Sequence, residues 1–77
     1  MNELMKLGIE RLRDTYPNRK IEPVMALYRG GAFRCSFYVN NRSAYGIGAS
    51  MNECCDSMIA AIREADECGL EKELFEI

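Results

Sequence analysis

The chain has 77 residues, 48% hydrophobic and 29% charged, with a formal net charge of −2 at pH 7. This length fits one domain, residues 1–77, whose core is small enough that self-association is a realistic route to stability. No apolar run approaches the roughly 18 residues of a membrane span, and the N-terminus lacks the basic start and apolar run of a secretory signal. We therefore expect a globular, cytoplasmic protein.

The cysteines give no sign of a disulfide framework or a metal centre. They fall at apolar positions of the predicted strands and helices, without a Cys-x-x-Cys spacing, and the chain has no histidine. Two of them are adjacent on a predicted helix and point about 100° apart, which is poor geometry for one metal. We expect buried or half-buried thiols and no metal or cofactor; the four are Cys35, Cys54, Cys55 and Cys68.

The first predicted element is a helix that begins after Asn2, a good N-cap residue, and ends before Pro17. Apolar side chains recur in it at helical spacing, and charged ones occupy the remaining positions. The inward stripe is predicted to be Met5, Ile9, Leu12 and Tyr16, with Leu4 and Gly8 on its flank.

From Ile21 the period of the apolar residues changes to two, which predicts strands over about 21–29, 33–39 and 44–48. A Gly30-Gly31 turn and an Asn40 to Ser43 turn would connect them into an antiparallel meander, and Pro23 favours an edge position for the first strand. The expected cross-strand pairs are Tyr28 with Phe33, Ala26 with Cys35, Val24 with Phe37, Val39 with Ala44, and Phe37 with Gly46.

A second helix over about 51–68 carries the clearest punctuation in the chain. Ser50 and Glu53 form a capping box in which the carboxylate reaches back to the N–H of Ser50, and Gly69 can close the C-terminus. The predicted inward stripe is Met51, Cys55, Met58, Ile62 and Ala65, widened by Cys54, Ile59 and Ala61. Residues 70–77 are expected to add one or two helical turns, with a docking peptide as the alternative.

These elements predict an α+β fold in which both helices cover one sheet face (αβββα). The core face of the third strand would then be Ala44, Gly46 and Gly48, whose small size lets the second helix approach closely. The other face would be largely apolar or aromatic, as partner surfaces commonly are, unless a register error moves part of it inside. Its predicted residues are Met25, Leu27, Arg29, Arg34, Ser36, Tyr38, Tyr45 and Ile47.

The order of elements over residues 2–68 resembles the double-stranded-RNA-binding domain. That family opens its last helix with Gly-x-Gly-x-Ser-Lys-Lys-Glu-Ala-Lys and continues with alanines, and the matching residues here are Gly46, Gly48, Ser50, Glu53, Cys54, Ala60 and Ala61. The family's phosphate-binding lysines are replaced by Met51, Asn52 and Cys55, and the longer first loop, often with a histidine, is absent. The resemblance implies the fold and argues against duplex RNA binding.

Charge is divided unevenly along the chain. Residues 1–42 hold eight Lys or Arg and four acids, whereas residues 43–77 hold two and eight, which predicts a basic side and an acidic side, or simply a solvated surface. The acids of the last helix lie largely off its apolar stripe, and no nucleophile stands beside a base, so we expect no catalytic residues.

Two functions remain open. The first is a small interaction protein, a regulator or inhibitor, that binds another protein or a second copy of itself through the sheet face and the acidic helix. Short acidic chains of this kind often come from phages or mobile elements that block host nucleic-acid machinery, including CRISPR complexes. The predicted contacts are Met25, Leu27, Arg29, Arg34, Tyr38, Tyr45, Ile47, Asp56, Glu64 and Glu67.

The alternative function is nucleic-acid binding by the strands. A single strand would stack on Tyr38 and Tyr45, with Arg29, Arg34 and Arg42 at its phosphates. Both functions use the same sheet face, so they exclude one another at this surface.

Overall fold

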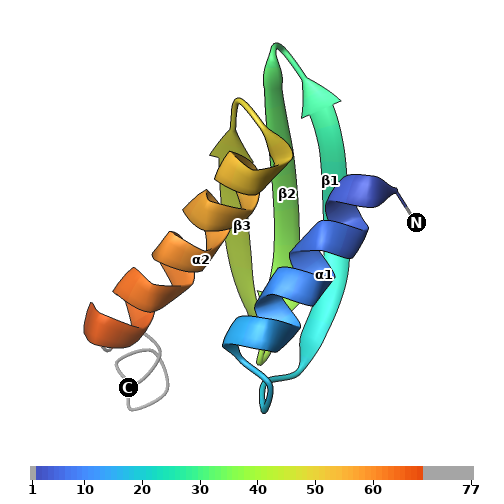
Figure 1. Ribbon diagram of the computed structural model, residues 1–77. Coiled ribbons are helices and arrows are strands. Elements are labelled where there is room, and N and C mark those ends of the chain that lie inside the picture. The colour runs from blue at the N-terminus through green and yellow to red at the C-terminus, as the bar shows by residue number, and fades with distance from the viewer. Residues whose placement is uncertain (1, 69–77) are drawn as a thin grey trace.

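The computed structural model describes residues 2–68. The order of elements is α1 (Glu3–Thr15), β1 (Ile21–Arg29), β2 (Ala32–Val39), β3 (Arg42–Gly48) and α2 (Met51–Cys68). The strands form one antiparallel sheet in the order β1-β2-β3, and both helices pack on the same face of it (Figure 1). The predicted αβββα fold is therefore confirmed; the predictions for Gly69 and residues 70–77 lie outside the described residues.

Both hairpins turn on two residues with positive φ. Gly30 and Gly31 have φ of 61° and 77°, and Asn40 and Asn41 have φ of 52° and 67°. Such backbone angles match the right-handed twist of the strands, and they suit glycine and, among the other residues, asparagine best. The two turns therefore set the register of the whole sheet.

The register of the first hairpin was predicted correctly up to a β-bulge at Val24. Tyr28 pairs with Phe33 as expected, but Pro23, not Val24, lies opposite Phe37. The ladder is interrupted beside the proline, which has no N–H to donate, and the extra residue is left unpaired. Val24 is consequently 51% exposed instead of lying on the core face.

The second hairpin is tighter than predicted. Its turn is Asn40-Asn41 alone, so Val39 pairs with Arg42 and Phe37 pairs with Ala44. The predicted pairs of Val39 with Ala44 and of Phe37 with Gly46 are wrong by two residues. A shift of two keeps each side chain on its predicted face, since side chains alternate along a strand.

The core lies between the sheet and the helices. Its fully buried side chains include Phe37 from β2 and Leu12 from α1. In α1 the most buried stripe is Leu4, Gly8 and Leu12, one position round from the predicted Met5, Ile9 and Tyr16, which are half-buried. In α2 the buried residues were all predicted; they are Cys54, Cys55, Met58, Ile59 and Ile62. Of the other predicted inward residues, Met51 and Ala65 are half-buried and Ala61 is exposed.

The N-terminus of α2 is fixed on β3 by its cap and by glycine. Ser50 Oγ accepts from the N–H of Glu53 at 3.1 Å, as predicted. The Glu53 carboxylate reaches one residue further than predicted and accepts from the N–H of Ala49 at 2.9 Å. Because Gly46 and Gly48 present no side chains, the first turns of α2 rest directly on the β3 backbone.

Replacing Gly46 tests this close approach. A Cβ at Gly46 would lie 2.2 Å from the Cys54 carbonyl oxygen and 2.8 Å from Met58 Cβ, so Gly46→Ala should lower the free energy of unfolding by about 3 kcal/mol. The matched control is Gly30→Ala, which has positive φ but no neighbouring atom within 4 Å and should cost about 1 kcal/mol. Urea denaturation of both variants measures the difference; equal losses would contradict the proposed packing.

Candidate interaction surface

The face of the sheet away from the helices carries side chains from all three strands, which we call the open face. Pairing places them in rows across the strands: Leu27-Arg34-Ile47, Met25-Ser36-Tyr45 and Glu22-Tyr38-Ser43, with Arg29 and Ala32 beside the first turn. The predicted strand contacts of a partner thus share one face, while the sheet's other face is covered by α1 and α2 (Figure 1).

Large side chains on the open face remain accessible to water. Tyr38 and Tyr45 are each 44% exposed, Ile47 40% and Leu27 37%. Arg34 is half-buried, and its Nη1 donates to the Tyr45 hydroxyl at 3.1 Å across the two strands. The face therefore combines an apolar surface with a basic group that is already partly ordered.

Glu22 was not predicted on the open face. Without the bulge, strict alternation would put Glu22 on the helix side of the sheet, whereas Met25 and Leu27 lie on the open face. The extra residue at Val24 shifts the alternation by one, so that Glu22 also lies on the open face. The one signal in the sequence was Pro23, because a proline just inside a strand often accompanies a bulge.

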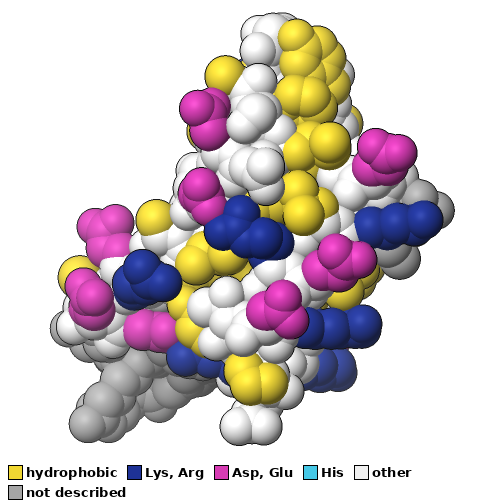
Figure 2. Space-filling view, in the orientation of Figure 1, with side chains coloured by type: hydrophobic (Ala, Val, Ile, Leu, Met, Phe, Trp, Pro, Cys, Tyr) yellow, Lys and Arg dark blue, Asp and Glu magenta, His cyan; other side chains and the backbone are white. Residues whose placement is uncertain are grey.

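The helix side of the molecule is more polar. Figure 2 shows acidic and basic side chains spread over the helices, with hydrophobic side chains gathered at the tip of the sheet, where the first hairpin projects past them. At this tip Tyr28 is 62% exposed and contacts Phe33 edge-to-face, with ring centroids 4.7 Å apart. Tyr28 was expected on the core face, and it lies beyond the reach of the helices.

Both sheet edges are occupied in part by side chains from the helix layer. Asn2, the N-cap of α1, donates its side-chain N–H to the Ala26 carbonyl on the outer edge of β1 at 2.7 Å. On the outer edge of β3, Ser57 of α2 accepts from the N–H of Ile47 at 3.3 Å. These contacts leave strand addition at either edge less favourable than contact with the open face.

Fewer acidic side chains of α2 are available to a partner than the sequence predicts. Asp56 pairs with Arg11 of α1, and Asp66 pairs with Arg19 at 2.9 Å, so these acids tie the helix layer together. The side chains of both pairs are about one-third to two-thirds exposed, and each pair contributes at most about 1 kcal/mol. Of the predicted acidic contacts, Glu64 and Glu67 remain exposed and without an ion pair in the described part of the chain.

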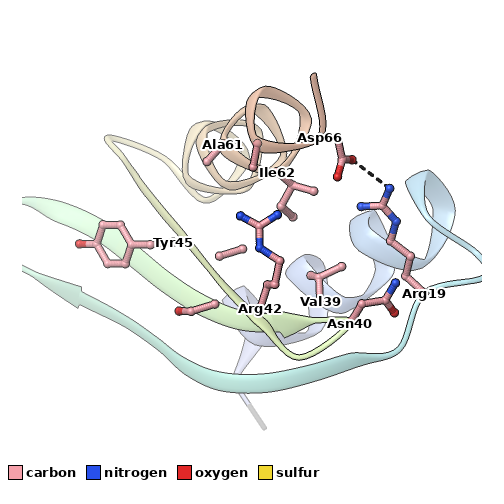
Figure 3. A pocket seen from close by; sticks show the side chains of 11 residues that line it. Arg19, Val39, Asn40, Arg42, Tyr45, Ala61, Ile62 and Asp66 are labelled. Carbon is pink, nitrogen blue, oxygen red and sulfur yellow. Dashed lines mark hydrogen bonds and ion pairs between the residues drawn. The ribbon is translucent and has the colours of Figure 1, made fainter. Parts of the chain in front are cut away.

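A groove of about 160 Å³ separates the second half of α2 from the start of β3. Figure 3 shows Arg42 in it, pointing toward α2, and Arg19 bound to Asp66 at its end. Arg42 therefore lies on the helix side and not with the tyrosines, because it pairs with Val39 directly after the turn. The volume is below the roughly 300 Å³ of the smallest usual ligand sites.

Three thiols lie together in the core. Cys54 Sγ is 3.4 Å from Cys35 Sγ and equally far from the Gly46 carbonyl oxygen, and Cys35 Sγ is 3.9 Å from Met58 Sδ. Burial raises the pKa of Cys35 and of Cys55, and neighbouring cysteines raise both further. Cys35 and Cys55 are therefore protonated and unreactive at neutral pH. Within residues 2–68, no three His, Cys, Asp or Glu side chains lie close enough together to hold a metal ion.

Comparisons of the chain with protein families, curated proteins and solved structures find no match. The resemblance to the double-stranded-RNA-binding domain therefore remains a prediction from the sequence. Among the described helices, none combines the length and apolar character that a membrane crossing requires.

Because the thiols of Cys35 and Cys55 are buried, we expect the free energy of unfolding to fall at alkaline pH. The unfolded thiols deprotonate above a pH of about 8.5, whereas burial raises the pKa of folded Cys35 and Cys55 above that of the unfolded thiols. Their contribution to the free energy of unfolding should therefore be constant below this pH and fall above it. The slope approaches about 1.4 kcal/mol per pH unit for each thiol. Urea denaturation between pH 7 and about 9.5 measures it, and Cys55→Ala should have a smaller slope than the parent.

Proposed function

We propose that the chain is a non-enzymatic protein-interaction module, a regulator or inhibitor, that binds a partner protein through the open face. The observation that carries this proposal is the exposure of Leu27, Tyr38, Tyr45 and Ile47 on one sheet face. A sheet face that merely met water would be mostly polar, and contiguous apolar patches commonly mark partner surfaces.

The residue types on the open face also suit a protein partner. Tyrosine, arginine and methionine are enriched in protein interfaces, because all three bury large areas, and tyrosine and arginine also make hydrogen bonds. Arg34 is held by Tyr45, so part of the ordering that binding requires is already present.

The acidic side of α2 supplies a second, weaker contact. Glu64 and Glu67 would attract a basic surface, such as one that binds nucleic acid, and would raise the association rate more than the affinity. Asp56 contributes less, because Arg11 already neutralises its charge. A target in nucleic-acid machinery, CRISPR complexes included, is consistent with the size and acidity of the chain.

Substitution of the two open-face tyrosines tests the proposal. Tyr38→Glu with Tyr45→Glu places charge at the centre of the patch and should reduce partner capture from the native host at least about ten-fold, as for loss of interface anchors. The matched control is Glu64→Ala with Glu67→Ala. It should retain capture at high salt, because salt already screens the electrostatic attraction between these carboxylates and a basic partner surface. Equal capture by the tyrosine variant and the parent would rule out the open face as the binding surface.

A second candidate function is single-stranded nucleic-acid binding. Arg29, Arg34, Tyr38 and Tyr45 share the open face, which would combine stacking platforms with cations. Arg42 was predicted on this face but lies on the helix side, so fewer phosphates can be neutralised by the open face. This weakens the case for nucleic-acid binding.

A gel shift separates the two candidates. With single- and double-stranded RNA and DNA at low salt, we expect no retardation at about 10 μM protein, since only two arginines flank the tyrosines on this face. Retardation that disappears in Tyr38→Glu with Tyr45→Glu would favour the nucleic-acid function over the protein one.

A further inference from the structure

The open face has a pattern along β2 that a two-fold axis would match. Arg34, Ser36 and Tyr38 follow one another on this face, so the smallest side chain stands midway between a cation and an aromatic ring. Ser36 is half-buried between Met25 and Tyr45 of the flanking strands. Rotation about an axis through Ser36 exchanges the positions of Arg34 and Tyr38.

We infer that the open face binds a second copy of this chain, around a two-fold axis that passes over Ser36 and runs across the strands. The inference rests on the proposed function, since it names the occupant of the same surface. Arg34 of each copy then lies over the partner's Tyr38, which gives two equivalent cation–π contacts. Met25 and Tyr45 share the row of Ser36, so each of them meets its own copy along the axis.

The charges on the open face decide the direction of the two-fold axis. When two sheets pack face to face with their strands roughly aligned, the axis that relates the two copies runs either along the strands or across them. An axis along the strands would set Arg34 against the partner's Arg34, two like charges within an apolar contact. An axis across them reverses the strand direction, so that the end with Arg29 and Arg34 meets the end with the partner's Glu22.

Arg34 is prepared for this contact. Its guanidinium is bound to the Tyr45 hydroxyl at 3.1 Å and is held over the sheet, where a partner's ring can stack on it. A side chain that is ordered before binding loses less entropy in the complex, and guanidinium groups stack readily on aromatic faces.

The size of the open face fits a weak dimer. Three strands spaced by about 4.8 Å and about eight residues long give a footprint of about 14 by 26 Å. Each partner of a standard interface buries about 800 Å². This footprint of about 360 Å² before side-chain relief is less than half of that, a size typical of a weak, transient contact. We therefore expect exchange between monomer and dimer and not a permanent dimer.

Sedimentation of the full chain and site-directed cross-linking test the arrangement. Sedimentation between about 1 and about 500 μM should show the change from monomer to dimer. Cross-linking uses a short bis-maleimide in a Cys68→Ser background, since the other three cysteines are buried. Ser36→Cys should give a cross-linked dimer, and Ala60→Cys on the exposed side of α2 should give none.

Mixtures identify the axis. Arg34→Cys mixed with Tyr38→Cys should cross-link about five-fold more than Arg34→Cys alone, because two copies of residue 34 would be about 13 Å apart along the strands. The inference is overturned by self-cross-linking of Arg34→Cys as strong as the mixture. It is also overturned by a dimer that Tyr38→Arg leaves intact, because this variant would set two like charges against one another at each contact. A chain that stays monomeric at about 500 μM also overturns it, yet leaves the proposed function standing if the tyrosine variant still loses partner capture.

Discussion

The packing of α2 directly on the β3 backbone is the contact on which the rest of the arrangement depends. It requires that Gly46 and Gly48 have no side chain, since a Cβ at either would lie under 3.0 Å from the helix backbone. It also requires the helix to begin at a fixed point, which the Ser50 and Glu53 cap provides. Together these features determine which sheet face is covered and where the remaining core side chains meet.

The chain has only two helices in its described part, and both are used on the same face. α1 packs beside α2 and is joined to it by the Arg11–Asp56 pair, while Arg19, just beyond α1, pairs with Asp66. The ion pairs are too exposed to contribute much stability, but they bring the basic first half and the acidic second half of the chain together. Much of the predicted charge separation is therefore neutralised within the helix layer, and the open face is what distinguishes the surface.

The architecture was predictable because local signals agree with one another. The period of two, the Gly-Gly turn and the capping box each specify an element, and the bounds of α2 were predicted to the residue. Alternation also placed the predicted open-face residues correctly, since the register error in the second hairpin was an even number of residues. Face assignment is thus more robust than pairing.

The wrongly predicted positions have physical causes that cannot be inferred from composition or periodicity. The bulge at Val24 depends on how β1 accommodates Pro23 beside its partner strand, and it decides the place of Glu22. The two-residue turn depends on both Asn40 and Asn41 adopting positive φ, whereas either alone would allow a longer loop. Arg42 was misplaced for the same reason, because its face depends on where the turn ends.

The partly occupied sheet edges and the open face would together limit how a partner protein could be recognised. Strand addition draws its affinity from main-chain hydrogen bonds and tolerates many sequences, but Asn2 and Ser57 already occupy part of each outer edge. Recognition then rests on side chains, which makes it more specific and more sensitive to single substitutions.

Stacking of two open faces would also have a consequence for the helix layer. In a face-to-face dimer the two α2 helices lie on opposite outer sides, where Glu64 and Glu67 of both copies stay accessible. Two such surfaces on one particle bind a repeated or oligomeric basic target more tightly than either does alone, without any new contact. Self-association would therefore cover the open face and leave only the weaker α2 contact accessible to a basic partner, because the two surfaces lie on opposite sides of the same sheet.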